Sequence, residues 1–238
     1  MKDEKKLSGD IAVEGKAAAW FDNYWYHYKW PTIGAIIAII IFTVCMLQTC
    51  TKEKHDIIIV YAGPTYLSTS QTEQLSQVME SVMPHDFYED GDKSASMSMY
   101  EIYSEAQIKE INGSDSDKRI DTSRNTSQYQ MYLSKQQTGE TSLYFMDPWL
   151  YESMDKDYLL PVSEMLGDAQ TEGLMDDGYG VRLGDTDLYD EYSVLRLLPE
   201  DTVICVMQPL VWGGSSDEEI YGFAKEMFCA VVTHETEK

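Results

Sequence analysis

The sequence predicts an α/β protein in two parts, a single transmembrane helix followed by one open, mostly parallel-sheet α/β domain. Three observations lead to this prediction. The run from Trp30 to Thr51 carries no charge. From residue 56 on, short apolar segments alternate with segments of helical spacing, which is typical of a parallel sheet covered by helices. The chain has 41 Asp and Glu against 18 Lys and Arg, for a net charge of −23, and nucleic-acid binding would need clustered cations instead.

The uncharged run is long enough to cross a bilayer. A helix rises about 1.5 Å per residue, so roughly 20 residues span a hydrocarbon core of about 30 Å. Ile33 to Leu47 contains no charged side chain, and Thr43 is its one hydroxyl. We therefore expect a transmembrane helix over residues 30–51. The alternative is a buried segment in the core of the protein.

An aromatic segment precedes the predicted span. Seven of the eleven residues from Trp20 to Trp30 are Trp, Tyr or Phe, and Lys29 lies among them. Trp and Tyr favour the headgroup layer of a membrane, where the ring is buried and the polar tip stays hydrated. We expect residues 1–29 to be a cytoplasmic N-terminal segment with an aromatic interfacial belt, part of it a short helix along the membrane.

The charges flanking the span predict its orientation weakly. Five Lys precede the span, whereas only Lys52 and Lys54 follow it closely. Because cytoplasmic flanks are richer in Lys and Arg, we expect a cytoplasmic N-terminus at the cell membrane and an extracytoplasmic acidic α/β domain over residues 52–238. The long polar segment before the span indicates a signal-anchor rather than a cleaved signal peptide. Lipoprotein processing at Cys50 is the alternative, since residues 47–50 loosely resemble a lipobox.

Four segments of the domain have strand patterns. Residues 56–62 are a continuous apolar run ending at Gly63-Pro64, which fits a strand buried on both faces. Residues 96–103 alternate with period two, which fits a half-buried strand. Two further strands are expected over residues 142–146 and 203–207.

The segments between these strands predict helices and loops. Residues 70–83 have apolar side chains at helical spacing, and Pro84 ends the pattern. Asp147-Pro148 has the sequence of a helix start, an N-cap acid followed by Pro at the first position. Further helices are expected over residues 126–137 and 216–232. We expect residues 113–127 to form a solvated loop and residues 173–184 to carry no strong element.

One stretch of the domain resembles a known family. Residues 139–150, continuing to Tyr158-Leu159-Leu160-Pro161-Val162, are similar to the first lobe of bacterial extracellular solute-binding proteins, of the type 2 periplasmic-binding kind. Residues 56–64 resemble the opening strand of that lobe and its ligand-facing loop. The belt and span together resemble membrane-anchored proteins of Firmicutes. The resemblance covers residues 56–166 and implies one lobe of a two-lobed fold, with the second lobe missing or reduced.

The ends of two predicted strands hold the candidate binding site. Ligands of open α/β sheets bind outside the carboxyl ends of the strands. Here those ends are Tyr61 and Gly63 after one strand, and Asp147 and Trp149 after another. We expect these four residues to contact a ligand, and the alternative is that they serve only as turn and cap residues.

No pattern predicts a catalytic, metal or cofactor site. Residues 90–101 place oxygen ligands at the spacing of an EF-hand calcium loop, but Ala95 stands where the loop needs Gly. A polar turn leading into a strand accounts for the same residues. The four His are scattered, and no pair of them has metal-binding spacing. Cys205 and Cys229 lie in apolar runs and are expected to be unpaired.

These observations leave two classes of function open. The first is a non-enzymatic, solute-binding-protein-like domain that binds or senses a small solute or protein partner at the cell surface. The second is a structural or accessory module of a membrane or transporter complex, with no small-molecule ligand. A hydrolase would need a nucleophile and a base in contact, which the sequence does not reveal. The expected partners are the lipid bilayer and a solute or protein, and no cofactor is expected.

Overall fold

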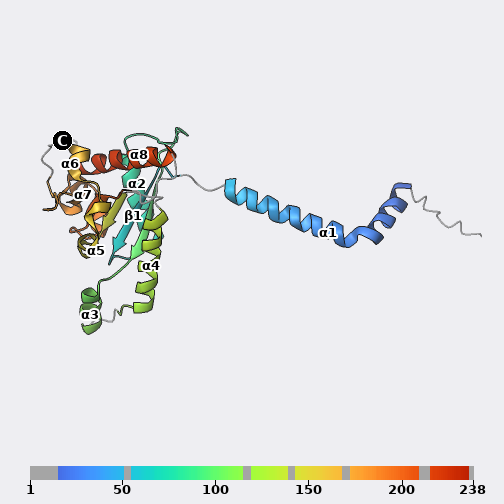
Figure 1. The fold of residues 1–238 in the computed structure, drawn as a ribbon, viewed down its shortest axis with the longest axis horizontal. Coiled ribbons are helices and arrows are strands. Elements are labelled where there is room, and N and C mark those ends of the chain that lie inside the picture. The colour runs from blue at the N-terminus through green and yellow to red at the C-terminus, as the bar shows by residue number, and fades with distance from the viewer. Residues whose placement is uncertain are drawn as a thin grey trace, which may run out of the picture. The chain divides into compact units, whose positions relative to one another are not determined.

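The structure is a computed structural model that describes residues 16–50, 55–114, 119–138, 143–167, 172–208 and 215–235. The chain divides into two compact units, Met1–Glu53 and Lys54–Lys238, and each is described by itself (Figure 1). The first 15 residues of the predicted N-terminal segment and Thr51 at the end of the apolar run lie outside the described residues.

The described part of the first unit is a single helix, α1, Lys16–Cys50, which contains both the aromatic segment and most of the apolar run. Its stretch Tyr24–Met46 is long and apolar enough to cross a bilayer. Between Tyr24 and Met46, most of the large apolar side chains are exposed, for example Phe42 at 66%. The helix bends in its N-terminal half (Figure 1), and Pro31 explains a bend because it lacks the N–H of a helical hydrogen bond.

The second unit is built on one open sheet of five strands in the order β2-β1-β3-β5-β4. The strands are β1, Ile57–Gly63; β2, Ala95–Glu101; β3, Leu143–Met146; β4, Gly180–Arg182; and β5, Val203–Val206. β1 pairs in parallel with β2 and β3, whereas β5 runs antiparallel to β3 and β4. The sheet is thus mixed, and its pairing is parallel only in the β2-β1-β3 half.

Helices cover both faces of this sheet. The long ones are α2, Thr69–Val82, and α8, Ser215–Val232, on one face, and α4, Thr122–Thr138, on the other, where α5, Pro148–Ser153, also packs. The shorter elements are α3, Glu105–Gly113; η1, Lys156–Tyr158; α6, Val162–Leu166; η2, Leu183–Asp185; α7, Asp187–Glu191; and η3, Ser193–Leu197.

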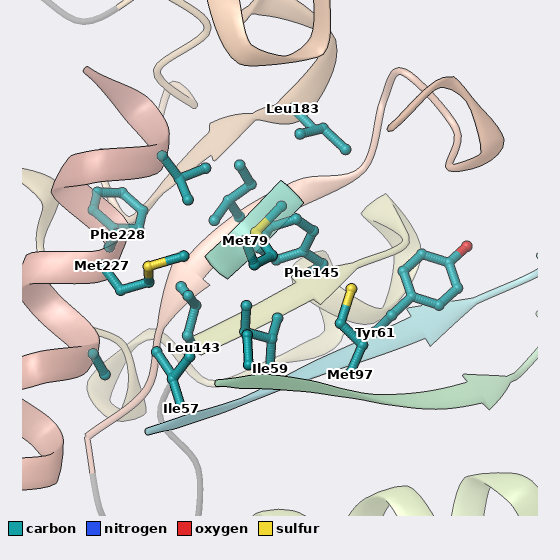
Figure 2. Close-up of a cluster of buried hydrophobic side chains, with 14 of the residues drawn as sticks. Ile57, Ile59, Tyr61, Met79, Met97, Leu143, Phe145, Leu183, Met227 and Phe228 are labelled. Atoms are coloured by element: carbon teal, nitrogen blue, oxygen red, sulfur yellow. The ribbon is translucent and has the colours of Figure 1, made fainter. Parts of the chain in front are cut away.

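Successive residues of each strand enter different halves of the core. In β1, Ile59 and Tyr61 enter the cluster beneath α2 and α8, whereas Val60 and Ala62 enter the cluster beneath α4. Figure 2 shows the first cluster, with side chains from β1, β2, β3, α2 and α8. Because both faces are buried, the apolar run of β1 is continuous, as the sequence predicted.

The predicted strands and the main helices are confirmed within one or two residues at most of their ends, and the N-cap of α5 is confirmed in its contacts. Two predictions are wrong. Residues 113–127, expected as a loop, include the first turns of α4. Residues 173–184, expected to carry no strong element, contain β4. Helix α3 was not expected; its nine residues bury no side chain and show only one apolar pair at helical spacing, Ile108 and Ile111.

A buried carboxylate holds the polar turn between α2 and β2. Asp56 stands directly before β1 and is 4% exposed. Its Oδ1 accepts hydrogen bonds from the backbone N–H groups of Phe87 and Tyr88, each at 3.0 Å. Its Oδ2 accepts a third from the N–H of Ser94 at 2.7 Å. Asp56 therefore satisfies three donors and fixes the turn against the start of the sheet.

Candidate functional site

The carboxyl ends of β1 and β3 lie side by side at one edge of the sheet. The backbone N–H of Asp147, directly after β3, donates to the carbonyl of Ala62 in β1 at 2.8 Å. The chain leaves β1 for β2 on one side and then crosses over to β3 on the other. Such a reversal of strand order is the place where open α/β sheets bind ligands. The ends of β1 and β3, where the sequence places Tyr61, Gly63, Asp147 and Trp149, therefore lie next to each other.

Gly63 stands where a larger residue has no room. A Cβ atom at this position would lie 2.6 Å from the Tyr61 hydroxyl oxygen and 3.4 Å from Cβ of Asp147. The first distance is far below van der Waals contact. Three of the predicted residues, Tyr61, Gly63 and Asp147, are therefore in close contact at this edge.

Tyr61 is fully buried, and among the described residues its hydroxyl has no hydrogen-bond partner of good geometry. Burial raises the pKa of Tyr61 to about 12; nearby Thr65 partly opposes this shift, and the negative charge of Asp147 adds to it. Figure 2 shows the hydroxyl pointing away from the aliphatic cluster toward the end of β1. The phenol is therefore a neutral group beneath the strand edge.

Asp147 performs the cap function that the sequence predicted. It is 8% exposed. Its Oδ1 accepts from the N–H of Trp149 at 3.0 Å, and its Oδ2 accepts from Nε2 of Gln107 in α3 at 3.1 Å. Burial raises the pKa of Asp147 above its ordinary value, although these two hydrogen bonds act in the opposite direction. The carboxylate therefore has a structural role, because it ties α3 and α5 to the end of β3.

The raised pKa predicts how Asp147 affects stability. Folding disfavours the ionised form, so the unfavourable contribution is present above the folded pKa and vanishes as pH falls below about 4, the unfolded value. Asn keeps the oxygen that caps Trp149 but turns an NH2 group toward Nε2 of Gln107, so it loses that hydrogen bond at every pH. We expect the stability of Asp147→Asn relative to the wild type to be higher at pH 7 than near pH 3. Urea unfolding at both pH values measures this, with the exposed Asp90→Asn as control; a relative stability that is the same at both pH values would contradict it.

Trp149 lies on the other face of the sheet, apart from the Tyr61 side chain. Its ring packs against the cluster beneath α4 and stacks on Tyr129, with centroids 6.4 Å apart and an interplanar angle of 30°. Its Nε1 is buried and has no hydrogen-bond partner among the described residues. The four predicted residues therefore share one edge, but their side chains divide between its two faces.

A pocket of about 430 Å³ opens beside Trp149. Its apolar walls are Trp149, Tyr129, Ile102 and Ile108, and its polar lining includes Asn125. Both side-chain groups of Asn125 are engaged: Oδ1 accepts from the N–H of Tyr103 at 2.8 Å, and Nδ2 donates to the carbonyl of Tyr103 at 3.0 Å. This fixed lining gives the pocket a rigid side.

Three residues of this pocket, Ile102, Ile108 and Asn125, were not among the predicted site residues. Ile102 lies near the end of the predicted strand, Asn125 lies in the first turns of α4, where a loop was expected, and Ile108 lies in α3, for which no helix was expected. One signal in the sequence could have found α3. Ser104 and Gln107 form a capping box. The backbone N–H of Gln107 donates to the Ser104 hydroxyl at 3.2 Å, and the backbone N–H of Ser104 donates to Oε1 of the Gln107 side chain at 2.7 Å. A Ser followed three residues later by Gln is the sequence pattern of such a helix start.

An ion pair borders the pocket. Arg124 in α4 contacts Glu101 at the end of β2 at 3.1 Å, and the Tyr103 hydroxyl donates to the same carboxylate at 2.8 Å. A smaller hollow of about 130 Å³ lies along this pair. The carboxyl edge therefore carries aromatic, acidic and cationic groups together.

Other candidate chemistry is absent or incomplete in the described part of the chain. No group of three or more metal-ligating side chains lies together among these residues. In the region with EF-hand spacing, Oδ1 of Asp90 accepts from the N–H of Asp92 at 3.3 Å, and β2 begins at Ala95, so a polar turn leads into a strand. His55 Nδ1 lies 2.7 Å from the Ser94 hydroxyl, but no described acid orients the other ring nitrogen, as a triad requires.

The two cysteines of the domain are not bonded to each other. Cys205 is fully buried in the cluster beneath α4, and Cys229 packs against the cluster on the opposite face. Burial raises the pKa of both thiols.

Comparison of the chain with known protein families, with curated proteins and with solved structures finds no match.

Proposed function

We propose that this chain is a single-pass membrane protein whose acidic α/β domain binds a ligand at the cell surface without catalysing a reaction. Its N-terminus is cytoplasmic and its domain extracytoplasmic. The ligand, a small solute or a short peptide, lies at the carboxyl edge of the sheet over Trp149. The observation that carries this proposal is the pocket of about 430 Å³ beside Trp149, at the edge where the strand order reverses.

The properties of α1 support the membrane part of the proposal. A core helix of a soluble protein buries its apolar face, whereas none of the most apolar stretch of α1 is buried. Ile37, Ile39 and Ile41 are all more than half exposed, at 51%, 64% and 58%. Exposed apolar side chains in such number are stable in lipid and unfavourable in water. The helix therefore serves as a signal-anchor, with the aromatic belt in the headgroup layer.

The arrangement of the strand ends supports the binding part. The parallel half of the sheet, β2-β1-β3, is the half that would correspond to the opening of a solute-binding lobe. The ligand would contact the rings of Trp149 and Tyr129, and Tyr61, Gly63 and Asp147 would position the edge beneath it. Apolar walls combined with placed polar groups are typical of a small-molecule site; the polar groups here are Ser104, Glu105, Thr122, Asn125 and Thr126.

Thermal unfolding of the purified full chain in detergent, with a panel of amino acids, dipeptides, sugars and polyamines, tests this proposal. A ligand at 100 times its Kd stabilises the folded state by about 2.7 kcal/mol. We expect at least one member of the panel to raise the unfolding temperature, and Trp149→Ala to abolish the increase. Trp149→Phe, which keeps an aromatic ring of smaller size and loses the N–H, should retain part of the increase.

Tyr158→Ala is the matched control, since Tyr158 is 48% exposed and does not line the pocket. A stabilisation that is equal in wild type and Trp149→Ala would place the ligand elsewhere. No stabilisation by any compound would favour the second candidate function, an accessory module without a small-molecule ligand. One observation favours that second function independently: the groove between α2 and the start of β2 is lined by two carboxylates, Glu73 and Glu80, and by no described Lys or Arg.

A further inference from the structure

Strand β2 is the outermost strand on one side of the sheet. Half of its backbone N–H and C=O groups therefore point away from the sheet, along a free side edge that is distinct from the carboxyl edge. The carbonyl of Ser94 accepts from the N–H of Asp56 at 2.8 Å, and the N–H of Ile102 donates to the carbonyl of Gly63 at 2.8 Å. Backbone groups alternate in direction along a strand. The even-numbered residues of β2 therefore bond to β1, and the N–H and C=O groups of the odd-numbered residues point away from the sheet.

One contact supports this alternation and marks where the free edge begins. The N–H of Ala95 donates to Oε1 of Glu80 in α2 at 3.1 Å. Glu80 thus covers the first outward N–H of the strand. The next outward groups belong to Met97, Met99 and Glu101, and no described strand pairs with them. An unpaired row of this kind is a template for another strand.

A groove of about 450 Å³ lies between α2 and the start of β2, and Met97 is the outward-facing residue of the free edge that lines it. α2 contributes Thr72, Glu73, Ser76 and Glu80 to its lining, and the start of β2 contributes Ser96. A groove bounded by a helix on one side and a free strand edge on the other accommodates an extended chain. In such a groove the backbone supplies hydrogen bonds and the alternate side chains supply specificity.

The charge of the groove indicates which chain it fits. Its lining holds two carboxylates, Glu73 and Glu80, together with the imidazole of His55, and among the described lining residues there is no Lys or Arg. At the far end of β2, Glu101 is already paired with Arg124 at 3.1 Å, so the acidic part of this edge is the part beside α2. A second copy of this protein would bring a further acidic groove and a net charge of −23. Like charges placed opposite each other across a strand pair are destabilising. Pairing of two copies through β2 is therefore disfavoured, and a cationic segment is favoured.

We propose that an extended, Lys- or Arg-containing segment of a partner protein adds as a sixth strand to β2, beside α2. Its backbone pairs with the outward groups of Met97, Met99 and Glu101. Its basic side chains, on the face toward α2, lie near Glu73 and Glu80. This interface is separate from the pocket beside Trp149, so the two proposals stand or fall independently.

A fluorescein-labelled nonapeptide of alternating Lys and Val tests this proposal on the full chain in detergent. We expect fluorescence anisotropy to show saturable binding. Methylating the backbone nitrogens that face β2 keeps the charge but removes the donors, and should weaken binding roughly tenfold or more through the loss of two or three hydrogen bonds. Reversing one exposed charge with Glu73→Lys should weaken binding about fivefold.

Two control variants separate binding in this groove from binding elsewhere on the acidic surface. Glu110→Lys reverses an exposed charge in α3, away from the groove, and should leave peptide affinity unchanged. Trp149→Ala should also leave it unchanged. If the methylated peptide bound as tightly as the unmethylated one, or if Glu110→Lys weakened binding as much as Glu73→Lys, the peptide would be attracted to the acidic surface in general, and the proposal would be overturned. Absence of any peptide binding would also overturn it. Slow hydrogen exchange of the Met97 and Met99 amides without peptide would assign the edge to a second copy instead.

Discussion

Ile37→Arg combined with Ile40→Arg should release the protein from the membrane. Both side chains are exposed on α1, Ile37 at 51% and Ile40 at 56%, within the stretch that is apolar enough to span a bilayer. An Arg at the centre of a transmembrane helix costs about 2.5–3.5 kcal/mol, and each lost Ile removes about 0.3–0.6 kcal/mol of favourable insertion. The two substitutions together therefore oppose insertion by about 6–8 kcal/mol, enough to reverse it.

Alkaline extraction of membranes measures this effect. We expect wild type to stay in the pellet and the double variant to appear in the supernatant or to be degraded. Ile37→Leu with Ile40→Leu is the matched control, since it changes the same positions and keeps their hydrophobicity; it should behave as wild type. A double Arg variant that remains as firmly in the pellet as wild type would show that this segment is not the anchor.

Asp56→Ala should destabilise the α/β domain by about 3–5 kcal/mol, since it removes three part-buried hydrogen bonds to a charged group, each worth about 1.5 kcal/mol. The substitution removes the acceptor of three backbone N–H groups, those of Phe87, Tyr88 and Ser94. Whole domains are stable by only about 5–15 kcal/mol. The loss would therefore be a large fraction of the total, and it would release the turn that enters β2.

Urea unfolding of the full chain in detergent, followed by circular dichroism, gives the change in the free energy of unfolding. Asp56→Asn keeps one acceptor oxygen and should lose roughly half as much, about 1.5–2.5 kcal/mol. Asp90→Ala is the control in the same turn, because Asp90 is exposed and accepts one hydrogen bond, from the N–H of Asp92 at 3.3 Å. If Asp56→Ala and Asp90→Ala were equally stable, the carboxylate of Asp56 would not be what holds the turn.

Much of the fold is encoded in local patterns that the sequence displays. The apolar run of β1 reflects burial on both faces, and α2 shows its inward face through Leu75, Val78 and Met79. β4 is three residues long and begins at Gly180, so it has too few side chains to form a pattern. The antiparallel direction of β5 depends on pairing with β3 and β4, which no short apolar run encodes.

The candidate site was predictable in position but not in detail. The residues after β1 and β3 could be identified because strand ends meet at one edge of an open sheet. Their division between two faces could not, because it depends on where the helices pack: Tyr61 lies beneath α2 and α8, and Trp149 beneath α4. The contact of Gln107 with Asp147 joins residues far apart in the chain, and no local pattern in the sequence predicts it.

Protease treatment of intact cells that express the chain with a C-terminal epitope tag tests the topology most directly. The account predicts that added trypsin removes the tag from intact cells, because the domain that follows α1 faces outward, while a cytoplasmic marker protein survives. A tag that is lost only after the cells are lysed would place the domain inside. That result would contradict a role in ligand binding at the cell surface.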